Sequence, residues 1–157
     1  MKNHLLPEGF RDSLLDAAEA ELNVNKIFLS VMKEFGFQFV KPPLVEFENS
    51  LFFNNEKQKN QSFRILDPLS QKVMAIRTDI TSQIARISCG SLAKSNRPLR
   101  LCYSGEILKV KNNNLNMSRQ STQLGGEIIG ITEDKVILVI IDLIIKILQK
   151  LKIKNFF

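Results

Sequence analysis

The chain has 157 residues, a hydrophobic content of 44%, a charged content of 24% and a formal net charge of +6. This length suits one domain with a real core and excludes a large multidomain chain. The lysines are scattered, which favours a general basic composition over a dedicated nucleic-acid-binding face. A single histidine and two cysteines without ligand spacing argue against a zinc site, and we expect neither metal nor cofactor.

No segment of the sequence predicts export or a membrane span. Residues 1–10 lack the continuous apolar core of a secretory signal. The apolar run 136–145 has about half the ~20 residues that a bilayer requires, and Asp142 interrupts it. Because two cysteines without a disulfide pattern are typical of a reducing compartment, we expect a cytoplasmic protein.

The first regular element expected is an amphipathic helix. Pro7 and Gly9 keep the preceding segment extended, and Ser13 is the expected N-cap. From residue 14 to residue 35, apolar side chains recur mostly at three- and four-residue steps, which predicts a helix. Gly36 is suited to end it, because glycine readily adopts the left-handed conformation found there.

Two short strands and a loop are expected next. The strands are predicted at 37–40 and 44–47, on either side of Pro42-Pro43, because adjacent prolines cannot donate ladder hydrogen bonds. The polar run 54–61 has no periodicity and predicts a mobile loop.

A hairpin and a second helix follow. Residues 63–67 and 72–77 flank a Pro-Leu-Ser-Gln turn, and this spacing predicts paired strands. Asp79 or Thr81 then caps a helix over about 82–92.

The most informative segment is 98–130, which predicts two strands joined by a polar loop. Gln123 and Glu127 stand four residues apart on the return strand, so their side chains point to the same face. An amide and a carboxylate among apolar residues suit a small cationic or amine-bearing ligand. Gly125-Gly126 indicates a close backbone approach or a bulge.

The last expected element is a helix capped by Thr132, with Glu133 and Asp134 at its positive dipole end and lysines at the other. The tail from residue 152 has the pattern of a further strand. The order of elements predicts an α+β fold, a mostly antiparallel sheet flanked by helices, in a single domain spanning 1–157.

Several segments, in this order, resemble the catalytic core of class II aminoacyl-tRNA synthetases in the histidyl-tRNA synthetase branch. The helix, strand and Pro42-Pro43 resemble the dimer-forming motif 1, residues 76–86 (IRTDITSQIAR) are similar to the Leu-Arg-Pro-Glu-Gly-Thr segment, and the 98–130 hairpin resembles motif 2. Within the branch, LLPEGFRD, PPLVEFENSL and RLCYSGEILKVK resemble the regulatory subunits of ATP phosphoribosyltransferase. The resemblance covers essentially the whole chain, but less than half of a family member.

This resemblance implies a histidine-binding pocket. Asp79 falls where the synthetase has the glutamate that meets the histidine α-amino group, and Thr81 matches the threonine of the same segment. Gln123 and Glu127 match residues that contact the bound histidine. Lys109 takes the position of the motif 2 arginine and keeps its charge without the planar bidentate fork.

The resemblance also implies that adenylation is lost. Lys111 replaces the glutamate of motif 2, and the motif 3 arginine is absent. Amino-acid activation needs positive charge at both ends of the triphosphate, so we expect no catalytic residues.

The function implied is that of a non-catalytic regulatory subunit of ATP phosphoribosyltransferase, acting at the first step of histidine biosynthesis. Its expected partners are histidine, the short-form catalytic subunit, and a second copy bound through the motif 1-like region within a hetero-oligomer; neither tRNA nor a membrane is expected. Two alternatives stay open. The chain is a fragment or degenerate form of a histidyl-tRNA synthetase that binds histidine or ATP, or it is a truncated product without function.

Overall fold

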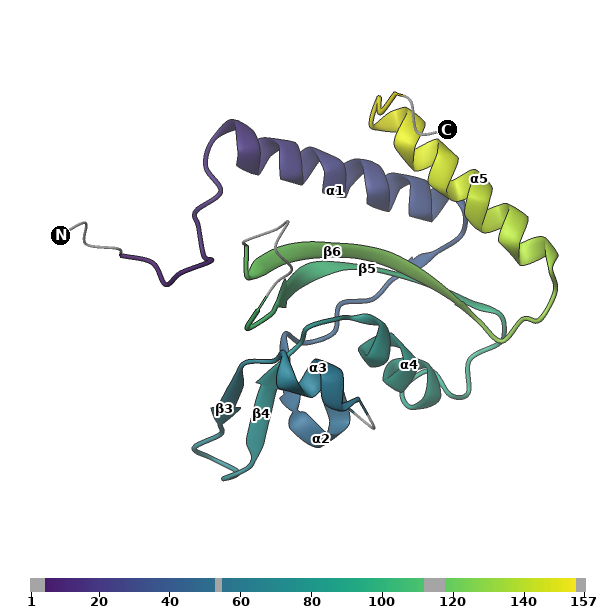
Figure 1. The fold of residues 1–157 in the computed structure, drawn as a ribbon. Coiled ribbons are helices and arrows are strands. Elements are labelled where there is room, and N and C mark those ends of the chain that lie inside the picture. The colour runs from purple at the N-terminus through teal and green to yellow at the C-terminus, as the bar shows by residue number, and fades with distance from the viewer. Residues whose placement is uncertain (1–4, 53–54, 112–117, 155–157) are drawn as a thin grey trace. The chain divides into compact units, whose positions relative to one another are not determined.

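The structure, a computed structural model, describes residues 5–52, 55–111 and 118–154 (Figure 1). The chain divides into two compact units, which are described separately. The first unit comprises residues 1–12, 41–83 and 105–123, and the second comprises residues 13–40, 84–104 and 124–157. The two long strands β5 (Leu99–Leu108) and β6 (Gln120–Ile129) confirm the predicted central hairpin, and each contributes residues to both units.

Helix α1 (Asp16–Glu34) of the second unit confirms the predicted amphipathic helix. It ends before Gly36, whose φ of 77° lies in the left-handed region that glycine tolerates best. The predicted cap at Ser13 is wrong. The helix begins after Leu15, which has a φ of 47°, and no side chain caps its first amides.

The core of the second unit lies between a sheet and two helices. Strand β1 (Gln38–Phe39) pairs in parallel with β5, which neighbours β6 in the order β1-β5-β6. Helices α1 and α5 (Lys135–Lys150) lie on the same side of this sheet (Figure 1). The buried core side chains between them are Phe28, Val31, Met32, Phe37, Cys102 and Leu143. The thiols of Cys89 and Cys102 are both free, as expected, and burial raises the pKa of Cys102.

Helix α5 is apolar along most of its length, but its boundaries differ from the prediction. Its N-cap position is Asp134 and no side chain caps it, so the prediction of a Thr132 cap is wrong. Residues 151 and 152 form a turn, 153 and 154 belong to no regular element, and 155–157, the rest of the expected strand, lie outside the described residues. No helix in the described ranges has the length and apolar character needed to cross a bilayer.

The first unit is built on a three-stranded antiparallel sheet of order β2-β4-β3. Its strands are β2 (Val45–Phe47), β3 (Arg64–Leu66) and β4 (Val73–Ile76), which confirms the predicted hairpin and the extended run after the two prolines. A short helix, α2 (Glu48–Leu51), follows β2 directly. Ala75 of β4 is fully buried with Leu51 and Phe52, and this cluster holds α2 to the sheet.

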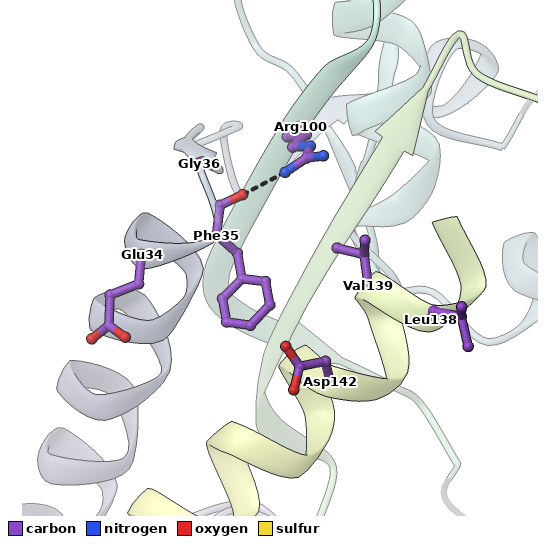
Figure 2. Close-up of a pocket in the computed structure, with 7 residues that line it drawn as sticks. All are labelled: Glu34, Phe35, Gly36, Arg100, Leu138, Val139 and Asp142. Atoms are coloured by element: carbon purple, nitrogen blue, oxygen red, sulfur yellow. Dashed lines mark hydrogen bonds between the residues drawn. The ribbon is translucent and has the colours of Figure 1, made fainter. Parts of the chain in front are cut away.

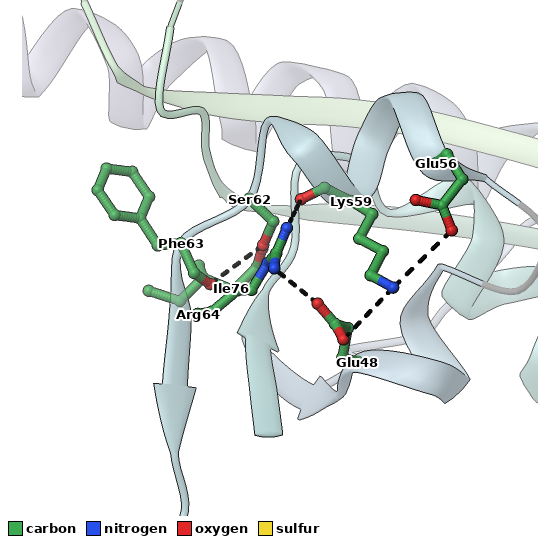
Figure 3. A network of polar contacts seen from close by, with 7 residues as sticks. All are labelled: Glu48, Glu56, Lys59, Ser62, Phe63, Arg64 and Ile76. Carbon is green, nitrogen blue, oxygen red and sulfur yellow. Dashed lines mark hydrogen bonds and ion pairs between the residues drawn. The ribbon is translucent and has the colours of Figure 1, made fainter. Parts of the chain in front are cut away.

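A second short helix, α3 (Glu56–Asn60), stands where a loop was predicted over 54–61, so this prediction is wrong for its described part. The Asn55 side chain caps it by accepting a hydrogen bond from the amide of Gln58 at 3.1 Å. The half-buried Glu48 carboxylate lies 3.0 Å from Arg64 Nε and 3.7 Å from Lys59 Nζ (Figure 3). Charge pairing and capping therefore order a segment that lacks an apolar periodicity.

The architecture confirms the predicted α+β class, with helices flanking sheets that are antiparallel except for the β1–β5 pair. The parallel pairing follows from β1 being joined to β5 by a long crossover rather than by a hairpin.

We expect acid to weaken the link between α1 and α5. Hydrogen bonds from Lys150 and Lys146 lower the pKa of Glu34 to about 2, from 4.5. A depressed carboxyl pKa contributes stability that is present above the unfolded value and is lost as the pH falls from 4.5 through about 2. Thermal unfolding measured across this range should show a difference between wild type and Glu34→Gln that shrinks to nothing at the acid end. A matched Glu19→Gln variant on exposed α1 surface should show no such convergence, and a Glu34 carboxyl that titrates near 4.5 by NMR contradicts the prediction.

Candidate functional site

A buried arginine organises the part of the first unit that carries the candidate ligand residues. Arg77 follows β4 and is only 5% exposed. Its Nε donates to the carbonyl of Glu106 at 2.7 Å, and its Nη1 donates to the carbonyl of Pro42 at 3.1 Å. Burial lowers the pKa of Arg77, while Glu106 and Glu46 act in the opposite direction. The guanidinium therefore ties β4 to β5 and to the proline segment before β2.

Gln83 completes this arrangement from α4 (Thr81–Cys89), the predicted second helix. Its side chain is 1% exposed, and its Nε2 donates to the Pro43 carbonyl and to Glu46 Oε1, both at 2.8 Å. Its Oε1 lies 3.4 Å from Arg77 Nη1. These bonds of Gln83 fix the first turn of α4, and Arg77 fixes the chain just before the turn that contains Asp79.

Asp79 and Gln123, two of the predicted ligand residues, are brought into direct contact. Gln123 Nε2 donates to Asp79 Oδ2 at 2.9 Å, and Gln123 Oε1 accepts from the amide of Ile80 at 2.9 Å. Asp79 Oδ1 accepts from the Thr81 amide at 2.7 Å. Both ends of the glutamine amide therefore bond to the turn before α4. Of the two residues expected to cap this helix, Asp79 bonds to the amide of its first residue, Thr81, and the helix ends at Cys89 rather than at 92.

Thr81 and Lys109 are positioned differently. Thr81 is the first residue of α4, and its side chain is exposed. Lys109 directly follows β5, where its amide donates to the Arg119 carbonyl at 2.8 Å, and its side chain is half-buried. The structure thus places Thr81 beside the Asp79 carboxylate and Lys109 at the end of the hairpin strand.

The two glycines of β6 allow close packing on opposite faces of the strand, as the sequence indicated. A Cβ at Gly125 would lie 2.4 Å from the ring of Tyr103, and one at Gly126 would lie 2.2 Å from Met32 Cε. Alternation along β6 therefore places Gly126 toward the core and Gly125 on the face that also carries Gln123 and Glu127. A bulge is not needed to explain either glycine.

Glu127 is oriented by a buried tyrosine of β5. Tyr103 is 3% exposed, and its hydroxyl lies 3.3 Å from Glu127 Oε1. Its ring covers Gly125. The sequence signal for this contact was Gly125, which has no side chain and lies two residues before Glu127 on the same face of β6.

Arg119, which sequence reasoning missed, holds the N-terminal segment. Its guanidinium carbon lies 4.7 Å from the ring centroid of Phe63 and 5.3 Å from that of Phe10, within cation–π range. Its Nη1 donates to the Glu8 carbonyl at 3.2 Å, and its amide donates to the Gly9 carbonyl at 2.7 Å. No motif marked Arg119, because its partners, at residues 8–10 and 63, lie more than 50 positions before it in the sequence.

The predicted ligand residues do not line the open cavity of about 720 Å³ in the second unit (Figure 2). Helices α1 and α5 and strand β5 supply its lining, including Arg100 and Asp142. Arg100 is engaged there, since its Nη1 donates to the Phe35 carbonyl at 2.8 Å. Within the described ranges, no cluster of three or more histidine, cysteine, aspartate or glutamate side chains could hold a metal ion.

Comparison with known proteins identifies the family. The model of the family described as Histidyl-tRNA synthetase matches residues 9–157. The chain belongs to the histidyl-tRNA synthetase family. This confirms the resemblance inferred from the hairpin, the Asp79 segment and the proline pair.

The curated relatives of this family member include proteins named ATP phosphoribosyltransferase regulatory subunit. One from Paramagnetospirillum magneticum is 46% identical over 127 residues, which is 80% of this chain and 34% of that protein. One from Bordetella pertussis is 34% identical over 156 residues, which is 99% of this chain and 40% of that protein. The chain therefore spans between a third and two fifths of the length of these relatives.

Solved structures of the histidyl-tRNA synthetase family show the same fold. The structure titled ATP phosphoribosyltransferase regulatory subunit/histidyl-tRNA synthetase, from Bacillus halodurans, matches 96% of this chain with a TM-score of 0.83 and 24% identity, and 39% of its own chain is covered. The apo histidyl-tRNA synthetase of S. aureus matches 92% of this chain with a TM-score of 0.75 and 19% identity, and 34% of it is covered. At these identities the likeness shows the fold alone.

We expect Gln123→Glu to destabilise this family member by about 1–3 kcal/mol, because the new carboxylate faces Asp79 and cannot donate to it. Urea unfolding at pH 7 measures the change. Gln38→Glu on exposed β1 is the matched control and should change the stability little. Equal stability of the two variants contradicts the mutual hydrogen bonds of Asp79 and Gln123.

We expect Gly125→Ala to destabilise the chain by about 1–3 kcal/mol, because its Cβ would displace the buried Tyr103 ring. Combining it with Tyr103→Leu, which removes the ring, should relieve part of that cost. A double-mutant cycle by urea unfolding measures the coupling, and strict additivity of the two changes contradicts the proposed contact.

Proposed function

We propose that this chain is the synthetase-like core of a non-catalytic regulatory subunit of ATP phosphoribosyltransferase, which binds histidine and acts through a short-form catalytic subunit in the cytoplasm. The observation that carries the proposal is the identity of 44–46% over 127 residues with three proteins that bear this subunit's name. Because those relatives are about three times longer than the matched region, partner binding by this chain is itself part of the proposal.

The proposed ligand chemistry rests on side chains of complementary charge. In it, Asp79 receives the histidine α-amino group, Gln123 and Thr81 add polar contacts, and Lys109 pairs with the histidine carboxylate. Glu127 accepts a hydrogen bond from the imidazole and stabilises its protonated form. A histidine ammonium brings a full positive charge to the Asp79 carboxylate, whereas the Gln123 amide that bonds there now is neutral. The exchange of donors at Asp79 is thus energetically reasonable.

Lysine at 109 and 111 supports binding without adenylation. A lysine ammonium is a point charge and cannot make the bidentate contact of an arginine with a carboxylate and a phosphate. The positive charge of Lys111 stands where the histidyl-tRNA synthetase motif has a glutamate. The proposed oligomer joins two copies through the motif 1-like region, with α1 and the Pro42-Pro43 segment, and binds catalytic subunits around them.

The proposal is tested by mixing the chain with a purified short-form ATP phosphoribosyltransferase and following phosphoribosyl transfer to ATP. We expect activity to rise on mixing and to fall when histidine is added. No gain on mixing overturns the regulatory role. Histidine-dependent exchange of pyrophosphate into ATP by the chain alone favours a degenerate histidyl-tRNA synthetase instead.

Histidine binding is tested separately by calorimetry. We expect Glu127→Gln to weaken histidine binding about tenfold at pH 6, because a neutral amide no longer stabilises imidazolium. The matched control Glu133→Gln should bind as wild type does. Equal affinities of the two variants contradict the assignment of Glu127.

A further inference from the structure

The side-chain amide of Gln123 has one orientation that the surrounding protein fixes. Its Nε2 donates to Asp79 Oδ2, and its Oε1 accepts from the amide of Ile80, each at 2.9 Å. Ile80 is fully buried, so water does not readily replace this acceptor. Reversing the glutamine amide would place its NH2 group against the Ile80 N–H, and two donors cannot bond to each other.

The Asp79 carboxylate is divided between two partners within the protein. Its Oδ1 accepts from the amide of Thr81, the first residue of α4, at 2.7 Å. Its Oδ2 accepts from Gln123, so a ligand ammonium that approaches Oδ2 meets the NH2 group of the glutamine. An ammonium has three donors and no acceptor. In the observed orientation, Gln123 therefore offers such a ligand a competing donor instead of an acceptor.

We propose that Gln123 is an internal competitor for Asp79, which an α-ammonium group displaces by reversing the glutamine amide. In the reversed orientation, Oε1 accepts from the ammonium and Nε2 no longer donates to Asp79. The amide of Ile80 then loses its acceptor. The inference rests on the proposed function, because histidine is the ligand that brings an ammonium to Asp79.

This exchange makes the turn before α4 sensitive to one group of the ligand. Arg77 is bonded to the Glu106 and Pro42 carbonyls before the turn, and Gln83 is bonded to the Pro43 carbonyl after it. The change is thus confined to residues 78–80, between these two anchors. A ligand with an imidazole and a carboxylate but no α-amino group leaves Gln123 bonded to Asp79 and Ile80. Histidine alone alters the hydrogen bonding of the turn.

Calorimetry with histidine and with 3-(imidazol-4-yl)propanoate, which lacks the α-amino group, tests the competition. Gln123→Met keeps the length of the side chain and removes both amide groups. We expect this variant to bind histidine about fivefold more tightly than wild type, because no internal donor has to leave Asp79. Its affinity for the propanoate should be unchanged.

Gln120→Met is the matched control on the same strand. The Gln120 Nε2 also donates to a carboxylate, Glu106 Oε2 at 3.1 Å, but its side chain is exposed. This variant should bind both compounds as wild type does. Histidine binding that is unchanged or weaker in Gln123→Met overturns the competition and leaves the proposed histidine binding in place, and an equal gain for the propanoate also overturns it. If neither wild type nor Gln123→Met binds histidine, the proposed ligand and this inference are both wrong.

Hydrogen exchange of the Ile80 amide in the wild-type chain, followed by NMR, tests the reversal without any substitution. We expect saturating histidine to speed this exchange about tenfold relative to that of the Arg77 amide, because the Ile80 amide loses its acceptor. The Arg77 amide is the reference, since it donates to the Leu44 carbonyl at 3.1 Å and takes no part in the exchange. The propanoate should leave the ratio of the two rates unchanged. A ratio that histidine does not raise overturns the reversal.

Discussion

The first unit depends on the burial of one guanidinium. A buried charge is costly unless its donors are satisfied, and Arg77 satisfies them chiefly with backbone carbonyls of Glu106 and Pro42 rather than with a carboxylate. Those carbonyls belong to segments far apart in the sequence. Gly105 makes the arrangement possible, because a Cβ there would lie 2.3 Å from Arg77 Nη2. The need to satisfy the donors of Arg77 therefore joins β4 to β5 and to the proline segment, and it also engages Gln83 in the first turn of α4.

In the turn that follows Arg77, the Asp79 side chain and the Ile80 amide already form hydrogen bonds within the protein. Gln123 bonds to both the side chain of Asp79 and the amide of Ile80, so the amine ligand proposed for Asp79 would compete with an internal donor. Binding and folding would then share the same hydrogen bonds. A ligand that takes one of them alters the support of the α4 N-terminus, which offers a physical route from a small molecule to the position of a helix.

The second unit depends instead on close backbone packing. Strand β6 has no side chain at Gly126, where Met32 and Phe37 fill the space, and none at Gly125, where the Tyr103 ring lies. The two adjacent glycines therefore serve both faces of one strand. At Gly126 the core side chains Met32 and Phe37 pack directly against β6. At Gly125 the open space lets the Tyr103 ring lie where its hydroxyl reaches Glu127.

The sequence by itself determined the elements whose signals are local. Periodicity defined α1, the two hairpins and α5, and the motif order identified the histidyl-tRNA synthetase family. Tertiary structure decided the helix caps and α3, because capping depends on backbone angles and on partners such as the Asn55 side chain. It also decided that Asp79 meets Gln123 and that Arg77 and Arg119 organise the first unit. These contacts join residues more than 25 positions apart, and no periodicity or spacing records such a distance.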